Sequence, residues 1–177
     1  MGRRSSLPGR ACVHSGMHTL LRSAALLLVA ASVHAQPTAP LEVKRPDGSS
    51  VTLSATQLAA LPRVSGTASA HGNSFAFEGS ELRAVLRLAG VTPVDSLHGA
   101  QLRRVVLFVG ADGYSALIAL SDLDASIGGR RVILVDREDG KPLPEKLGPR
   151  RIIIEGDRRP SRWVRQVVRV EVRDVAD

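Results

Sequence analysis

Short apolar runs separated by turn residues constrain the fold of this chain more than any other feature. Segments such as Leu102–Val109 and Val167–Val172 are rich in branched apolar residues and have strand rather than helix length. Turn signals such as Pro46-Asp47-Gly48 and Gly110-Ala111-Asp112-Gly113 divide one run from the next. We therefore predict an α+β fold that is β-rich, with mixed sheets of roughly eight short strands rather than a parallel βαβ repeat.

The segment Glu81–Ala89 has the periodicity of a helix and is predicted to be the main one. Ser80 is the expected N-cap, and Gly90 is the expected stop. A shorter helical turn is expected at Ala55–Leu61 after the cap Ser54. The apolar residues of the main helix share one face: Leu82, Val85, Leu86 and Ala89.

Residues 1–35 have the pattern of an export signal. A basic start is followed by the apolar run Ala24–Val33, and small residues at positions 33 and 35 predict cleavage before Gln36. The run is shorter than the roughly 20 residues that span a bilayer. We predict a signal peptide over 1–35 (with Met17 as an alternative start), a flexible lead-in over 36–40 and one domain over 41–177. The expected location is periplasmic or secreted, with no membrane span after signal cleavage.

Charge and cysteine content exclude several functions for the exported part. Removing residues 1–35 takes four arginines and no acids, so the formal charge falls from +7 to +3. That mild charge, with few aromatic residues, argues against a nucleic-acid partner. The single cysteine, Cys12, lies in the removed segment. The exported chain would therefore have no disulfide, no thiolate metal ligand and no thiol nucleophile.

Four sequence pieces, in order, resemble the molybdopterin-binding domain of sulfite-oxidase-type oxidoreductases. The first, TASAHGN, resembles the family's T-x-x-C-x-G-N loop, and the second, FEGSELRAVL, resembles its aromatic-x-G-V-x-L-x-x-L-L segment. The third is the turn ADGY before an apolar strand. The fourth contains DGKPLP, GPRRI and RWVR. They begin at Thr67, Phe77, Ala111 and Ile133.

The chain departs from the family at the position that carries the chemistry. In the catalytic members the loop cysteine binds molybdenum through its thiolate, and the resemblance places Ala70 there. A methyl group donates no electron pair to a metal. His71 is adjacent, but neighbouring residues of a strand point to opposite faces, so we do not expect it to replace the cysteine. We expect no metal ligand and no catalytic residue here.

The resemblance also implies a ligand cleft in which basic residues meet the phosphate end of the cofactor. Arginines of the last third are suited to this, because guanidinium groups bind phosphate and carboxylate in bidentate fashion. The alternative is a purely structural role: the arginines would form a solvated basic edge, and the segment 112–114 would be an ordinary turn. The expected cleft residues are His71, Asn73, Asp112, Tyr114, Arg150, Arg162 and Arg165.

Three functions follow from these observations. The preferred one is a non-catalytic, exported module on the sulfite-oxidase-type fold that binds a small anion or a pterin-like molecule, or a protein. The second is a working molybdopterin-dependent oxidoreductase, which the resemblance admits, with molybdopterin as cofactor. The third is an accessory subunit that docks onto a larger redox or signalling protein.

Overall fold

The structure is a computed structural model that describes residues 39–175. The predicted export signal, residues 1–35, lies outside the described residues, as do residues 36–38 of the predicted lead-in.

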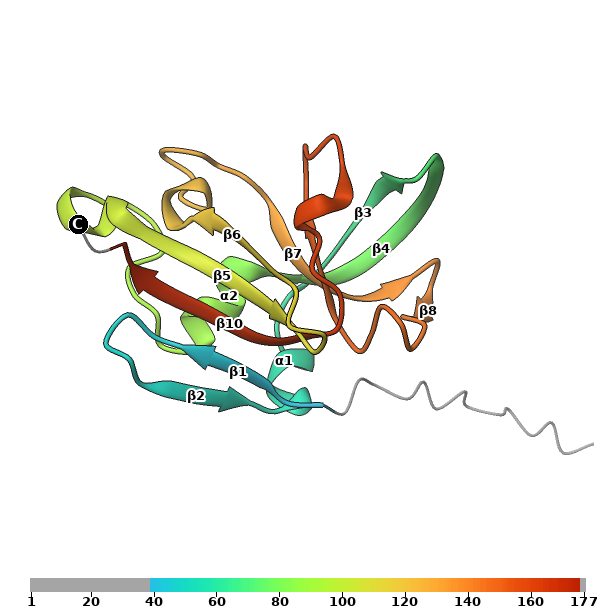
Figure 1. Cartoon of the computed structure of the whole chain (residues 1–177), viewed down its shortest axis with the longest axis horizontal. Helices are drawn as coiled ribbons and strands as arrows, with labels where there is room; N and C mark the ends of the chain where they lie inside the picture. Colours follow the sequence, from blue (N-terminus) through green and yellow to red (C-terminus); the bar gives the residue numbers. More distant parts are fainter. Residues whose placement is uncertain (1–38, 176–177) are drawn as a thin grey trace, which may run out of the picture. The chain divides into compact units, whose positions relative to one another are not determined.

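A five-stranded sheet with the order β2-β1-β10-β5-β6 forms one side of the domain (Figure 1). The pair β1–β10 is parallel, and the other pairs are antiparallel. Alternation along β5 turns Val106 and Phe108 inward, where both side chains are fully buried. The strands are β1 (Leu41–Lys44), β2 (Ser50–Leu53), β5 (Arg104–Gly110), β6 (Ser115–Ala119) and β10 (Val167–Asp174).

The second sheet contains the long hairpin β3–β4 and places β7 beside β4. Both β8 and β9 pair antiparallel with β7, at different parts of its length. All four residues of β9 are buried, so this strand lies in the core rather than on the surface. The strands are β3 (Arg63–Ala70), β4 (Asn73–Glu81), β7 (Val132–Glu138), β8 (Lys141–Pro142) and β9 (Arg151–Ile154).

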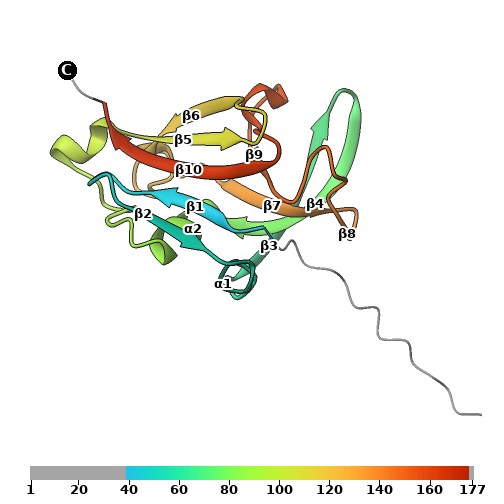
Figure 2. The same ribbon diagram turned by 60° about the horizontal axis from the view of Figure 1, so that its bottom comes forward.

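Two α-helices complete the described domain. Helix α1 (Ala55–Ala59) begins with the predicted cap, since Ser54 and Gln57 form a capping box. Helix α2 (Leu82–Leu88) buries Leu82, Val85 and Leu86 and contacts β4 and β7. Short 3₁₀ helices occur at η1 (Gly99–Arg103), η2 (Leu120–Asp122) and η3 (Pro160–Arg162). Helix α2 lies behind β10 in Figure 1, and in the turned view it lies below β1 and β10 (Figure 2).

The predicted fold class, a β-rich α+β domain with one main helix, is confirmed. The first sheet is mixed, and the second pairs its strands antiparallel throughout. The predicted cap of that helix is wrong. Ser80 is buried inside β4, where it pairs with Arg63 and Leu134, and Glu81 precedes the helix without a side-chain cap. Strand β4 continues directly into the helix, so Ser80 is a strand residue and not a cap.

Four connections meet at one end of the two sheets and form the site described below. They are the β3–β4 turn, the β5–β6 turn, the segment after β8, and the segment from β9 through η3. Strand β9 fixes part of this arrangement from its edge, because the Ile152 N–H donates to the Val164 carbonyl at 2.8 Å. Among residues 39–175, no helix has the length and apolar character needed to cross a membrane.

Candidate functional site

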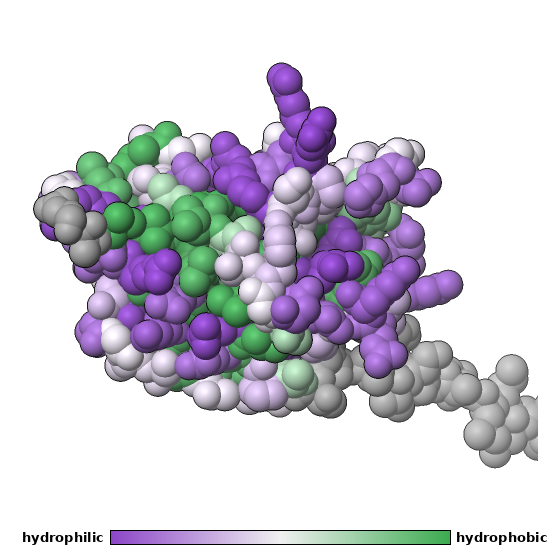
Figure 3. Space-filling view, in the orientation of Figure 1, coloured by the Kyte–Doolittle hydropathy of each residue, from purple (hydrophilic) through white to green (hydrophobic). Residues whose placement is uncertain are grey.

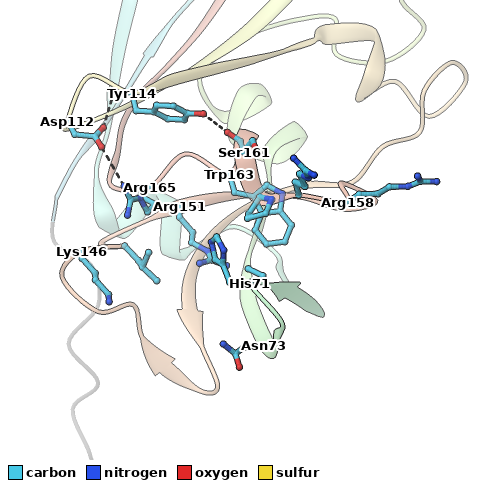
Figure 4. A pocket seen from close by; sticks show the side chains of 14 residues that line it. His71, Asn73, Asp112, Tyr114, Lys146, Arg151, Arg158, Ser161, Trp163 and Arg165 are labelled. Atoms are coloured by element: carbon cyan, nitrogen blue, oxygen red, sulfur yellow. Dashed lines mark hydrogen bonds and ion pairs between the residues drawn. The ribbon is translucent and has the colours of Figure 1, made fainter.

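A cleft of about 1020 Å³ opens where these four connections meet (Figure 4). Its walls come from residues far apart in the sequence, so the cleft exists only when both sheets are assembled. The lining residues are Ala70, His71, Asn73, Asp112, Tyr114, Lys146, Leu147, Arg151, Arg158, Arg159, Pro160, Ser161, Trp163 and Arg165.

Arg151 is the buried charge of the cleft. Its guanidinium carbon lies 4.7 Å from the centroid of the Phe75 ring and 5.7 Å from that of Trp163. These distances suit cation–π contact, which is stronger where water is excluded. Nη1 lies 2.8 Å from Oε1 of Glu138, but the two groups are not aligned as a hydrogen bond. The other two nitrogens, Nε and Nη2, have no hydrogen-bond partner. Arg151 therefore holds two hydrogen-bond donors beside the cleft that no described residue satisfies.

Burial opposes the charge on both members of this pair. Burial lowers the pKa of Arg151, and attraction to Glu138 counters part of that effect. Burial likewise raises the pKa of Glu138, and Arg151 counters part of it. An arginine starts so far above neutral pH that it stays protonated. The cleft therefore keeps a positive group beneath its surface.

One side of the mouth of the cleft is held together by contacts between two of the connections. The Tyr114 hydroxyl donates to the Ser161 carbonyl at 2.6 Å and so links the β5–β6 turn to η3. In the same turn, Oδ1 of Asp112 accepts from the Tyr114 N–H, and Oδ2 lies 3.9 Å from Arg165. Figure 4 shows these contacts on one side of the cleft, with Arg151 and Trp163 near its centre.

The remaining charged groups make the cleft strongly cationic. Lys146, Arg158 and Arg159 line it and have no ion-pair partner among residues 39–175. Hydrophilic side chains accordingly cover the end of the molecule that carries η3 and the β3–β4 hairpin, whereas apolar ones gather over β5 (Figure 3). Asp112 is the single acid in the lining, and Arg165 already pairs with it. Such a field attracts anions.

The structure brings together five of the seven residues predicted for the cleft: His71, Asn73, Asp112, Tyr114 and Arg165. Ala70, which the sequence resemblance would place at the family's cysteine position, also lines it. His71 differs from the expectation that it would face away from Ala70. It has a φ of 53° in the tight β3–β4 turn, so the alternation of strand faces ends before it and both residues line the cleft.

Arg150 and Arg162 are not part of the lining. Arg150, the residue before β9, is 2% exposed and lies outside the cleft lining. Burial lowers its pKa, and Asp136 partly offsets this. Arg162 is bound to Asp157, with Nη2 2.5 Å from Oδ1. That contact raises the pKa of Arg162 and directs its charge away from the cleft.

Sequence reasoning missed the central residues of the site, Arg151 and Trp163. Strand alternation requires only one of the adjacent pair Arg150 and Arg151 to face the cleft, and the sequence does not say which. Trp163 belongs to the buried core and is 8% exposed, and its side chain also lines the cleft. Its indole N–H is buried and has no hydrogen-bond partner.

The lining suits only part of a molybdopterin cofactor. The cations suit its anionic end, but Ala70 offers the metal no lone pair. Residues 39–175 hold no group of three or more His, Cys, Asp or Glu side chains arranged to bind a metal ion. The donor set therefore does not fit a molybdenum centre tied to the protein by a thiolate.

No protein-family model and no curated protein matches this sequence. Solved structures do match, among them the crystal structure of the sulfane dehydrogenase SoxCD from Paracoccus pantotrophus, with a TM-score of 0.62 and 17% sequence identity. The likeness covers 80% of this chain and 40% of that chain. This chain thus spans less than half the length of the chain that it resembles. At this identity the likeness concerns the fold alone: the domain has a fold like that of the matched part of the sulfane dehydrogenase, in agreement with the predicted sulfite-oxidase-type fold class.

Proposed function

We propose that this protein is an exported, non-catalytic module whose basic cleft binds a small oxyanion or the anionic end of a pterin-like molecule. The proposal rests chiefly on Arg151, a residue of the cleft lining that is more than nine-tenths buried and has two nitrogens without a hydrogen-bond partner. Planar N–H donors of this kind recognise phosphate-like and carboxylate groups in bidentate fashion.

The surrounding charges support the same ligand class. Lys146, Arg158 and Arg159 add positive charge at the rim, and Trp163 offers a further N–H donor and an aromatic face. An aromatic ring beside an oxyanion site suits a flat heterocycle that carries an anionic group. The combination favours a ligand with one planar and one anionic part over a purely apolar ligand.

Position 70 supports the non-catalytic part of the proposal. Ala70 lines the cleft at the place that the family resemblance assigns to the molybdenum ligand. A carbon side chain cannot coordinate the metal there, so an inherited fold does not carry inherited redox chemistry. Export is proposed from the sequence of residues 1–35, and fractionation of the cells that make the protein tests it.

Anion binding is tested by titrating the purified protein with sulfate, phosphate and a pterin phosphate while the fluorescence of its one tryptophan is followed. Because Trp163 lines the cleft, occupancy should change its emission. Arg151→Met should weaken binding by about a hundredfold, since charged hydrogen bonds contribute about 1.5–3 kcal/mol. The matched control is Arg173→Met, an exposed arginine of β10 outside the cleft, which should bind as the parent does.

Two results would overturn the proposal. One is equal affinity of the parent and Arg151→Met for every anion tested. The other is stoichiometric molybdenum, measured by mass spectrometry, in protein isolated from its own cells. The second result would favour the alternative of a molybdopterin-dependent oxidoreductase.

A further inference from the structure

Strand β3 is an open edge of the second sheet. Over its eight residues it pairs with β4 on one side, and no other strand among residues 39–175 pairs with it. Its sequence, RVSGTASA, has no proline or lysine, and Arg63 at its start is its one charge. Natural edge strands are usually protected by such residues or by a covering segment. An edge of this length with small side chains is accessible to another extended chain.

The hydrogen bonds of β4 show which groups of β3 face outward. In an antiparallel pair, opposed residues either exchange both backbone hydrogen bonds or exchange neither. Ala76, opposite Thr67, has both of its backbone groups engaged with Asp139: its N–H donates to Oδ1 at 2.9 Å, and its carbonyl accepts from the Asp139 N–H at 2.9 Å. Thr67 must therefore direct its own N–H and C=O away from β4. By alternation, Ser65 and Ser69 do the same.

A groove of about 460 Å³ runs beside this edge. Thr67, Ala68 and Ser69 form one wall, and the segment from Ile153 to Arg158 with Trp163 forms the other. The outward backbone groups of Thr67 and Ser69 thus border a space that can hold a chain. Figure 1 shows β3 between β4 and the segment that leads into η3, which agrees with this placement.

The charges along the groove favour an acidic occupant. Its two acids are already paired, Glu155 with Arg131 at 2.8 Å and Asp157 with Arg162 at 2.5 Å. Arg158 lines both the groove and the basic cleft and has no ion-pair partner among the described residues. Trp163 also borders both spaces. The groove therefore leads from a neutral strand edge into a cationic cleft.

We propose that β3 accepts an extended segment of a partner protein as an added strand, with an acidic residue of that segment directed toward Arg158. Strand addition satisfies the outward N–H and C=O groups through main-chain hydrogen bonds, and the groove and its charge select the sequence. A second copy of β3 fits less well, because that strand has no acid to meet Arg158. This inference deepens the interaction part of the proposed function and does not require a small anion in the cleft.

The test uses fluorescein-labelled nonapeptides of alternating Thr and Val with two aspartates near one end, titrated into the purified protein. Two further peptides carry backbone N-methyl groups on alternate residues. One peptide is methylated at the odd-numbered residues and the other at the even-numbered residues. An added strand uses every second peptide amide, so one phase should lose at least about tenfold in affinity and the other should keep it. Replacing the aspartates with lysine should also abolish binding.

Protein variants locate the binding edge. Thr67→Pro removes an outward N–H that the β3–β4 ladder does not use, so it should fold and fail to bind. Thr67→Val keeps that N–H and is the matched control, which should bind. If Thr67→Pro does not fold, the two N-methylated peptides still test strand addition on the parent protein.

Equal loss from both N-methyl phases, unchanged binding by a folded Thr67→Pro, or a dimer of the free protein that the same variant dissolves would each overturn the proposal. Phosphate titration of these variants separates it from the proposed function. Peptide binding without anion binding would contradict only the small-anion cleft, and the reverse would contradict only strand addition.

Discussion

Glu138 is the partly buried counterion of Arg151, with Oε1 2.8 Å from Nη1 and side chains that are 18% and 8% exposed, respectively. The two residues come from the paired strands β7 and β9, so the core of the second sheet places them. Because this pair compensates the charge beneath the cleft, the excess positive charge is supplied by the exposed side chains at its rim. A change at either residue should therefore affect stability as well as ligand binding.

Arg151→Met should destabilise the fold by about 3 kcal/mol, because it leaves the Glu138 carboxylate in a largely buried site without its counterion. Urea unfolding at neutral pH measures the change. The double variant Arg151→Met with Glu138→Gln should recover much of that loss, since no uncompensated charge remains. A double variant that is no more stable than the single one would show that Glu138 is not the residue that Arg151 neutralises.

Gly79→Ala should destabilise the domain by about 3 kcal/mol, as overpacking at a rigid contact does. A Cβ at this position would lie 2.2 Å from the Leu134 carbonyl oxygen, and the backbone of β7 cannot give way as a side chain can. Thermal unfolding measures the effect. Gly66→Ala is the comparison and should destabilise the domain less, because its Cβ would meet a side chain, the ring of Phe77, and not backbone. Equal tolerance of both substitutions would mean that β4 and β7 are not packed as closely as described.

Local patterns predicted most of the fold. The turn at Pro46-Asp47-Gly48, the cap Ser54 and the apolar face of α2 depend on neighbouring residues alone, and each occurs as expected. The prediction of Ser80 as a helix cap was wrong, because a serine suits a cap and a strand equally until its pairing with the partner strand β7 is known. The parallel pairing of β1 with β10 joins the two ends of the described domain, and no local signal reveals it.

The site was harder to predict, because its geometry depends on which side of a strand a residue faces. The family resemblance, and not turn chemistry, suggested His71, Asn73 and Tyr114 for the cleft, and all three line it. Arg150 and Arg151 could not be separated, as a shift of one residue in register exchanges their faces. The pairing of Arg162 with Asp157 joins two groups that the sequence presents only as separate charges.

Asp124 should make the domain sensitive to acid. Its buried carboxylate accepts from the Leu97 N–H at 2.7 Å and from the Ser126 hydroxyl at 2.6 Å. These bonds lower the pKa of Asp124 below its ordinary value of 3.8, although burial opposes them. A carboxyl group with a lowered folded pKa contributes stability that is present above its unfolded pKa and is lost as the pH falls toward the folded one.

Unfolding in urea from pH 7 to pH 3 tests this sign. Asp124→Asn should be less stable than the parent at pH 7, and the difference should shrink below about pH 4, where the parent begins to take up the proton. Asp174→Asn, which alters a half-exposed carboxylate, is the control and should change stability little. A difference that stays constant over this range would contradict the assignment.

Tyr114→Phe should loosen the mouth of the cleft without unfolding the protein. It removes the hydroxyl that donates to the Ser161 carbonyl at 2.6 Å, and the half-exposed ring stays in place. The expected cost is small, about 0.5 kcal/mol, at the low end for a hydrogen bond near solvent. Hydrogen exchange should quicken in the η3 segment and stay unchanged in β1. Unchanged exchange in η3 would mean that the contact does not hold the β5–β6 turn to η3.

A thiol placed at position 70 tests where this residue lies. In Ala70→Cys the new side chain would line the cationic cleft beside Arg151, and nearby positive charge stabilises a thiolate. Its pKa should fall below the ordinary value of about 8.5. The rate of alkylation by iodoacetamide, followed against pH, measures that pKa. The control Ala76→Cys places a thiol on the exposed part of β4, outside the cleft, where it should titrate normally. Similar pKa values for the two thiols would remove Ala70 from the cationic cleft, and with it the argument that this position matches the family's metal ligand.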